Sequence, residues 1–224
     1  MSLAVLYQDA EVAAVDKPAG RIVVPGRGAP ERTVREEAEA LLGPLWVVHR
    51  LDRGTSGVLL LARSAGSHRV LCGRFERHEV SKRYLALVRG ALAGDRRIDV
   101  PVAPGRKGRM RAGQGLPGAM PSETFVRPLV ACGPAATLVE AFPASGRTHQ
   151  VRVHLAHAGH PLLVDPDYGV HGPWTAPGGG TRLDRTPLHA ASLELLHPAS
   201  GLPLRVEAPL PEDIVRAVAA LRAP

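Results

Sequence analysis

The hydrophobic pattern of this chain consists of short apolar runs separated by Gly, Pro and charged residues. Runs of this kind are typical of strands that are buried in a sheet. The run 81–88 alternates between apolar and polar positions, so that Tyr84, Ala86 and Val88 would share one face of a strand. We expect strands at 3–6, 11–15, 21–25, 45–48, 58–62, 81–88, 122–126, 136–141 and 188–193.

Four other segments have the spacing and the end signals of helices. Thr33 and Glu36 form a capping box at the start of a helix that ends before Gly43. A second helix is expected over 64–79, a third between an N-cap at Thr148 and Gly159, and a fourth from Pro211. The apolar positions expected to face the core are Val151, Leu155 and Ala158 in the third helix and Ile214, Val215, Val218 and Leu221 in the fourth.

Two segments that are rich in Gly and Pro are expected to be irregular. The segment 101–121 predicts a long mobile hairpin or loop, and the segment 171–187 predicts a flexible surface loop. The first of them carries four cations that could follow a phosphate backbone and become ordered on binding it. These cations are Arg106, Lys107, Arg109 and Arg111.

Length and composition restrict the class of protein. A chain of 224 residues fits one domain or two small lobes that share a core, and its 45% hydrophobic and 22% charged content is ordinary for a soluble globular protein. Cys72 and Cys132 lack a metal-type spacing, which favours a reducing compartment and a cytoplasmic location. No secretion signal is apparent, and no apolar run approaches the ~20 residues of a membrane span.

The charge of the chain points to a polyanionic partner. The formal net charge is +7 and the sequence pI is about 10.2. The segment from Arg63 to Arg111 holds thirteen Lys or Arg and four Asp or Glu, so it carries +9 and the remainder carries −2. A positive charge concentrated in one part of the chain favours contact with a nucleic-acid backbone, and a merely solvated basic face is the alternative.

The most distinctive polar segment is His49-Arg50-Leu51-Asp52-Arg53-Gly54-Thr55-Ser56-Gly57, which lies between the apolar runs 45–48 and 58–62. A polar turn between two buried strands can hold a carboxylate on a rigid scaffold. Asp52 is therefore a candidate catalytic carboxylate. The alternative is a surface turn in which Asp52 caps a helix or pairs with Arg50 or Arg53.

A second polar segment, Gly146-Arg147-Thr148-His149-Gln150-Val151-Arg152-Val153-His154, opens the third expected helix. Arg152 taken alone would be a surface residue or an RNA-backbone contact. Four histidines in and after this segment suggest a metal site, to which Asp165 or Asp167 could add a carboxylate, but no HExxH pattern occurs. We expect no metal ion at these histidines, which are His149, His154, His157 and His160.

Together these segments resemble the motifs of pseudouridine synthases of the RluA type, the ribosomal large-subunit pseudouridine synthases. The segment 49–57 matches their His-Arg-Leu-Asp-x-x-Thr-Ser-Gly motif, and 146–154 matches their Gly-Arg-Thr-His-Gln-x-Arg-x-His segment. A Lys-Pro-x-Gly turn at 17–20, a Lys-x-Tyr strand at 82–84 and an Asp-x-x-Tyr-Gly segment at 165–169 extend the resemblance. The matches run from about residue 11 to 213, and Val164 departs from the pattern because a glycine is more usual there.

The resemblance implies a pseudouridine synthase-like α+β fold for residues 1–224. We expect a single domain with a long, largely antiparallel curved sheet, flanking helices and loops and a central active-site cleft, without the separate N-terminal RNA-binding domain of many relatives. The resemblance also implies that Asp52 is the essential carboxylate, that Arg152 pairs with it and that Tyr84 lies against the target base. A guanidinium beside Asp52 would lower the pKa of its carboxyl group.

The implied function is that of an isomerase that converts specific uridines of structured ribosomal or transfer RNA to pseudouridine. We expect a cytoplasmic monomer that needs no metal and no other cofactor. Two alternatives are a non-catalytic RNA-binding or ribosome-assembly protein on the same fold and a metal hydrolase built on the histidines. The residues expected to contact RNA are His49, Arg50, Arg53, Lys82, Arg83, Arg106, Lys107, Arg109, Arg111, Arg147 and His149.

Overall fold

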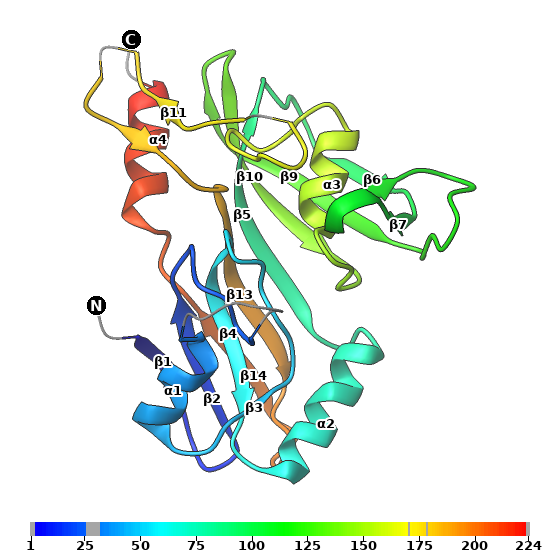
Figure 1. The fold of residues 1–224 in the computed structure, drawn as a ribbon, viewed down its shortest axis with the longest axis vertical. Coiled ribbons are helices and arrows are strands. Elements are labelled where there is room, and N and C mark those ends of the chain that lie inside the picture. Colours follow the sequence, from blue (N-terminus) through cyan, green and yellow to red (C-terminus); the bar gives the residue numbers. More distant parts are fainter. Residues whose placement is uncertain (1–2, 26–31, 170, 178, 223–224) are drawn as a thin grey trace. The chain divides into compact units, whose positions relative to one another are not determined.

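The computed structural model describes residues 3–25, 32–169, 171–177 and 179–222, which divide into two compact units (Figure 1). Unit 1 comprises Met1–Lys82 and Ala190–Pro209, and unit 2 comprises Arg83–His189 and Leu210–Pro224. The boundary falls inside two strands, β5 (Ser81–Arg89) and β13 (Leu188–Leu196), so each of them contributes residues to both units.

Unit 1 combines antiparallel strands with helices α1 and α2. Strand β2 pairs with β1 and with β4, β3 pairs with β4, and β14 pairs with β13. The capping box expected at the start of α1 is present, with the Thr33 side chain accepting from the backbone of Glu36. The elements are β1 (Ala4–Gln8), β2 (Val12–Lys17), α1 (Val34–Leu42), β3 (Trp46–Val47), β4 (Ser56–Ala62), α2 (Ala65–Glu76) and β14 (Pro203–Glu207).

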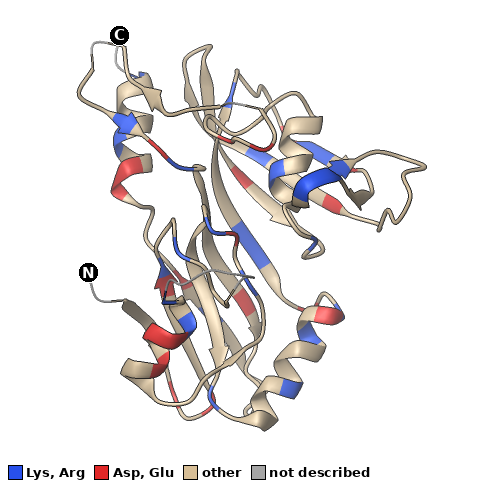
Figure 2. Cartoon of the chain, viewed as in Figure 1, with Lys and Arg blue, Asp and Glu red and all other residues tan. Residues whose placement is uncertain are grey.

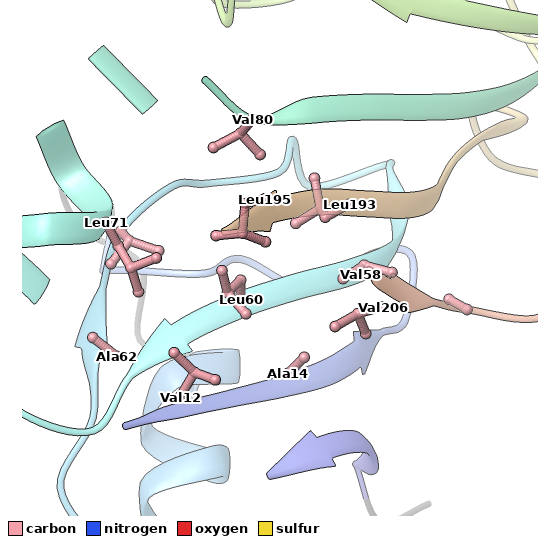
Figure 3. Packing of buried hydrophobic residues seen from close by; sticks show 12 residues of the cluster. Val12, Ala14, Val58, Leu60, Ala62, Leu71, Val80, Leu193, Leu195 and Val206 are labelled. Atoms are coloured by element: carbon pink, nitrogen blue, oxygen red, sulfur yellow. The ribbon is translucent and has the colours of Figure 1, made fainter. Parts of the chain in front are cut away.

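Strand β4 lies at the centre of the core of unit 1, and all of its residues are buried. Side chains from β2, β4, β13, β14 and α2 gather on one of its faces, as Figure 3 shows for Leu60, Leu71 and Leu195. Leu59 and Leu61 point into a separate cluster with residues of α1 and β2. A strand that is buried on both faces needs a continuous apolar run, which explains why 58–62 shows no alternation.

Unit 2 contains an antiparallel set of strands in the order β5-β10-β9-β6, together with the two small hairpins β7–β8 and β11–β12. Helix α3 packs Val151 and Leu155 into a cluster with apolar residues of β5 and β10. The elements are β6 (Arg96–Asp99), β7 (Val102–Pro104), the 3-10 turn η1 (Arg106–Gly108), β8 (Met110–Ala112), β9 (Glu123–Cys132), β10 (Ala136–Pro143), α3 (Gln150–His157), β11 (Trp174–Thr175), β12 (Arg182–Leu183) and α4 (Glu212–Arg222).

The expected α+β class with mostly antiparallel strands is confirmed. The single domain with a central cleft stays a prediction. No helix in the described part of the chain is long and apolar enough to cross a membrane.

The strand expected at 21–25 is wrong, because this segment is irregular. Val23 is buried in the core of unit 1, but its backbone meets a helix end instead of a neighbouring strand. The carbonyl groups of Ile22 and Val23 accept hydrogen bonds from the backbone N–H groups of Val34 and Arg35, the first residues of α1. The backbone carbonyl groups of this segment thus accept from N–H groups that have no partner within α1.

Three details of the expected helices and loops are also wrong. Helix α3 begins one residue later than expected, since its N-cap is His149 in a left-handed conformation and not Thr148. Ala158 is exposed because it is the C-cap that follows α3, and Val215 is exposed because the buried residues of α4 are Ile214 and Ala217. The expected surface loop 171–187, whose residue 178 lies outside the described residues, contains the β11–β12 hairpin and the buried Leu183.

Candidate active site

The motif at 49–57 forms the loop between β3 and β4. The Thr55 N–H group donates a hydrogen bond to the carbonyl oxygen of Asp52 at 3.1 Å, which closes a turn. Leu51, Thr55 and Ser56 are buried, whereas Asp52 is partly exposed. The neighbouring side chains therefore anchor the loop in the core and leave the carboxylate at its surface.

Lys17, at the end of β2, fastens this loop to the Lys-Pro-x-Gly turn. Its side chain is fully buried. Its ammonium group donates hydrogen bonds to the carbonyl oxygens of Pro18 at 3.0 Å, Arg21 at 2.6 Å and Arg53 at 3.3 Å. The Gly20 N–H group donates to the same Arg53 carbonyl at 2.7 Å. Lys17 thus holds the backbone next to the candidate carboxylate.

We expect Lys17→Met to lower the free energy of unfolding by about 3 kcal/mol, because the methionine removes a fully buried charged donor and its hydrogen bonds to three backbone carbonyl oxygens. Urea denaturation measures the loss. Lys107→Met, which removes an exposed lysine, is the control and should leave the unfolding free energy within about 0.5 kcal/mol of the native value. A Lys17→Met protein as stable as this control would show that the three contacts contribute nothing.

Gly57, the last residue of the motif, can only be a glycine. Its φ of +113° is a conformation that other residues rarely adopt, and a Cβ atom at this position would overlap the backbone of Ala190 in β13. Gly57 also pairs with Lys17 across the β2–β4 ladder. The strand that follows the candidate carboxylate is therefore closely fitted between its two neighbours.

His49 supports the loop from inside unit 1. Its ring stacks on Phe75 of α2 with a centroid distance of 4.7 Å, and its Nε2 accepts a hydrogen bond from the Leu60 N–H group at 3.0 Å. Burial, together with the positive charge of Lys82, lowers the pKa of His49 from 6.5 to about 3. The imidazole is therefore neutral, and these contacts stabilise the loop; its expected contact with RNA stays a prediction.

The pKa of His49 predicts a loss of stability in mild acid. The folded-state pKa lies below the unfolded value, so stability that is complete above pH 6.5 is lost as the pH falls from 6.5 towards 3. The free energy of unfolding of the native protein should fall between pH 7 and pH 5 by about 2 kcal/mol more than that of His49→Gln. Urea denaturation at the two pH values measures the difference. Comparison with the variant isolates the contribution of His49 from that of the other histidines, and equal losses would contradict the lowered pKa of His49.

In unit 2, helix α3 places Arg152 among carboxylates. Arg152 is 6% exposed, and its guanidinium donates to Asp165 Oδ2 at 2.9 Å, Asp165 Oδ1 at 2.7 Å and Asp167 Oδ2 at 2.7 Å. Its guanidinium carbon also lies 5.0 Å from the ring centre of Tyr168. The two acids and the aromatic ring fix the direction of this arginine.

Buried hydrogen bonds hold the start of α3. Gln150 accepts from the Ser145 hydroxyl at 2.7 Å and from the Arg147 N–H group at 3.1 Å, and it donates to the Thr124 hydroxyl at 3.2 Å. The Thr124 hydroxyl lies 2.8 Å from Nδ1 of His154, whose Nε2 lies 2.9 Å from the Val100 carbonyl oxygen. Burial lowers the pKa of His154, so this histidine is a neutral part of the core.

Tyr84 and its neighbours on β5 have different environments. Tyr84 is partly buried and lies on the same face as Ala86 and Val88, as the alternation predicted. Arg83 pairs with Glu140 at 2.7 Å. Burial lowers the pKa of Lys82 to about 8, so this cation is partly neutralised in mild alkali.

The remaining cations expected to contact RNA are mostly exposed. Arg53 is exposed and donates to the Gly20 carbonyl oxygen at 3.0 Å, and Nε of Arg147 is buried without a hydrogen-bond partner among the described residues. Figure 2 shows Lys and Arg positions along α2 and in the part of unit 2 around α3 and β7. The exposed members of the set are Arg50, Arg53, Arg106, Lys107, Arg109 and Arg111.

The structure gathers the candidate residues into two groups. Asp52 belongs to unit 1, while Tyr84 and Arg152 belong to unit 2, so their meeting in one site stays a prediction. Two kinds of supporting residue were missed from the sequence. The Lys-Pro-x-Gly spelling is that of a common turn and does not show that Lys17 is buried. Asp165 and Asp167 lie near histidines and suggest metal ligands, although the Asp-x-x-Tyr-Gly spelling marks their segment.

The expected absence of a metal site concerns the histidines around α3. Nδ1 of His149 lies 2.7 Å from the Tyr168 hydroxyl, and both ring nitrogens of His154 are in hydrogen bonds with the protein. Within the described ranges, no group of three or more His, Cys, Asp or Glu side chains has an arrangement that could hold a metal ion.

Comparisons with known proteins give a consistent result. The family model described as RNA pseudouridylate synthase matches residues 11–157. The chain is 39% identical over 234 residues to ribosomal large subunit pseudouridine synthase D of Xanthomonas campestris pv. campestris, covering 98% of this chain and 70% of that protein. It is 37% identical to ribosomal large subunit pseudouridine synthase C of Vibrio vulnificus, covering 97% of this chain and 69% of that protein.

The same similarity is found among solved structures. The structure of human RNA pseudouridylate synthase domain containing 4 matches with a TM-score of 0.78 at 26% identity, covering 98% of this chain and 93% of that one. The structure of human RNA pseudouridylate synthase domain containing 1 matches with a TM-score of 0.73 at 25% identity.

Proposed function

This chain belongs to the RNA pseudouridylate synthase family and is an RNA pseudouridine synthase, and from this premise we propose that it modifies uridine in large-subunit ribosomal RNA with Asp52 as its essential carboxylate. The ribosomal substrate is supported by relatives that are named ribosomal large subunit pseudouridine synthases D and C and that align over nearly the whole chain. The role of Asp52 is supported by its place on an anchored loop with a partly exposed carboxylate.

Isomerisation of uridine breaks the N1–C1′ bond, turns the uracil and forms a C5–C1′ bond. The hydrogen on C5 leaves as a proton and N1 gains one, so no oxidant, reductant or nucleotide cofactor is consumed. A carboxylate can take part as a nucleophile. The proposed first step is attack of Asp52 at C1′, its addition to C6 or its removal of the 2′-proton.

The residues of unit 2 have proposed roles around the base. Tyr84 offers an aromatic ring that can stack on a uracil turned out of its helix, a movement that costs a few kcal/mol. Arg152 is the arginine proposed to orient Asp52, and its own orientation is fixed by Asp165 and Asp167.

The basic residues supply the affinity for RNA. Because one segment of the chain carries most of the excess positive charge, binding should weaken steeply with salt. We infer in addition that the chain acts as one catalytic domain and as a monomer. We place it in the cytoplasm, where ribosomal RNA is modified and where the free thiols of Cys72 and Cys132 would stay reduced.

Tritium release tests the proposed substrate. Ribosomal RNA and transfer RNA are labelled with tritium at C5 of uridine, taken from a strain that lacks this gene, and incubated separately with the enzyme. We expect release from large-subunit ribosomal RNA, and sequencing for pseudouridine then identifies the position. Release from transfer RNA alone would overturn the proposed substrate, and no release from any cellular RNA would overturn the proposed function as a whole.

A further inference from the structure

The hairpin β7–β8 contacts the segment that supports Arg152. The hydroxyl of Tyr168 accepts a hydrogen bond from the Met110 N–H group at 2.7 Å. The guanidinium of Arg109 donates to the Pro166 carbonyl oxygen at 3.3 Å and lies 3.4 Å from Oδ1 of Asp167. The hairpin expected to be a mobile RNA-binding segment is therefore attached to residues 166–168.

Asp167 is shared between the hairpin and the candidate catalytic arginine. Its Oδ2 accepts from Nη2 of Arg152 at 2.7 Å, while its Oδ1 faces Nε of Arg109 at 3.4 Å. Burial alone would raise the pKa of Asp167, but hydrogen bonding and the positive charges of Arg152, His149 and Arg109 lower it. One carboxylate thus joins a buried arginine to an exposed one.

The two contacts of Asp167 differ in strength. Arg152 is almost fully buried and has short hydrogen bonds to both acids, so this contact is persistent. The Arg109 side chain is 50% exposed and its pair with Asp167 is long, which makes it a weak surface pair. The exposed part of the Arg109 guanidinium can therefore bind a phosphate oxygen while Asp167 stays paired with Arg152.

Tyr168 provides a second link between the β7–β8 hairpin and the start of helix α3. The hydroxyl that accepts from the Met110 N–H group also lies 2.7 Å from Nδ1 of His149. His149 precedes the first turn of α3, the helix that carries Arg152. Asp165 holds this arrangement together by accepting from the backbone N–H groups of Asp167 and Tyr168 at 3.0 and 3.3 Å.

We propose that Asp167 and Tyr168 are positioning residues that couple the β7–β8 hairpin to Arg152, so that RNA held by the hairpin cations sets the rate of isomerisation as well as the affinity. The inference rests on the proposed function and deepens it, because it makes the hairpin a part of substrate selection. An RNA that fills the site without reaching the hairpin would bind but react slowly. The hairpin thus favours substrates that continue beyond the target nucleotide.

Single-turnover tritium release at increasing RNA concentration separates rate from affinity. Arg109→Gln and Arg106→Gln each remove one exposed cation from the hairpin and should raise the half-saturating RNA concentration by a similar factor, roughly threefold. We expect Arg109→Gln to have a saturating rate about tenfold below that of Arg106→Gln, because Arg109 pairs with Asp167, whereas Arg106 has no ion pair among the described residues. Equal saturating rates for the two variants would overturn the coupling.

Tyr168→Phe tests the second link and keeps the ring beside Arg152. We expect a saturating rate about tenfold below the native rate, and a combined Arg109→Gln/Tyr168→Phe variant less impaired than the product of the single effects, since both changes release the same hairpin. A rate loss in the double variant equal to the product of the two single losses would overturn the inference. Thermal unfolding of each variant establishes that the protein is folded during the assay.

Hydrogen exchange at the Met110 amide tests the coupling without any RNA substrate. Asp167→Asn removes the charge that holds Arg109 and should accelerate exchange of this amide, which donates to Tyr168. Unchanged exchange in Asp167→Asn would overturn the inference even with an active enzyme. If the native protein released no tritium from any RNA, the proposed function would fail separately, and this exchange measurement would still decide the coupling.

Discussion

Asp52→Asn is expected to abolish tritium release from uridine-labelled RNA, with a fall in rate of at least about 10⁴-fold, and to leave the fold and RNA binding nearly unchanged. The amide has the shape of the carboxylate but is neither a nucleophile nor a base at neutral pH. The turn is closed by the backbone of Asp52 and anchored by Leu51, Thr55 and Ser56, and the substitution changes neither. Asp52→Asn should therefore lower the rate of tritium release without lowering the free energy of unfolding.

Three measurements establish this separation. Single-turnover tritium release gives the rate, filter binding gives the affinity for the same RNA, and urea denaturation gives the free energy of unfolding. Asp95→Asn removes an exposed carboxylate with one long ion pair to Arg127 and serves as the matched control, with a rate within about twofold of the native rate. An Asp52→Asn enzyme with at least a tenth of the native rate would remove Asp52 from the chemistry.

The candidate residues could be identified from the sequence where they lie in a contiguous motif. The segment around Asp52 is contiguous, so its spelling alone marked the loop, and the apolar runs on either side gave the strands that carry it. The segment that contains Arg152 was identified in the same way. Local signals also sufficed for the capping box of Thr33 and Glu36, since both partners lie within one helical turn.

Supporting residues whose partners are distant in the chain could not be identified in this way. The Lys17 ammonium reaches a carbonyl group 36 residues away, and nothing in the spelling of a Lys-Pro turn shows that the side chain points inward. Asp167 is equally ambiguous, because an aspartate near histidines suggests a metal ligand until the fold places Arg152 beside it. Tertiary contacts decide these roles, and the sequence pattern only restricts them.

Irregular segments were the least predictable part of the fold. The apolar residues at 21–25 pack into the core like a strand, but their carbonyl groups serve the first turn of α1. The Gly- and Pro-rich segment 101–121 was expected to form a long mobile hairpin or loop and contains the short β7–β8 hairpin, yet its attachment through Arg109 and Met110 has no local signal. In both cases the backbone partner comes from another element, so hydrophobic periodicity carries no information about it.

Gly57→Ala is expected to cost about 4 kcal/mol of unfolding free energy and to remove activity with it. Two penalties add at this position. The φ of +113° strains any residue with a Cβ atom, and the new methyl group would overlap the backbone of Ala190. Because Gly57 lies in the ladder with Lys17, relief of the overlap requires β4 or β13 to move and disturbs the loop of Asp52. Urea denaturation measures the loss of stability.

Gly20→Ala separates the two penalties and is the matched control. Gly20 also has a positive φ, of +86°, but a Cβ atom there would have no neighbour within 4 Å. Its replacement should cost only the backbone strain, about 1–2 kcal/mol, so Gly57→Ala should be the more damaging change by about 2 kcal/mol or more. Equal costs would mean that strain alone selects the glycine of the motif. A larger cost at Gly57 would mean that the close approach of β13 fixes the end of the loop, and hence the position from which Asp52 meets its substrate.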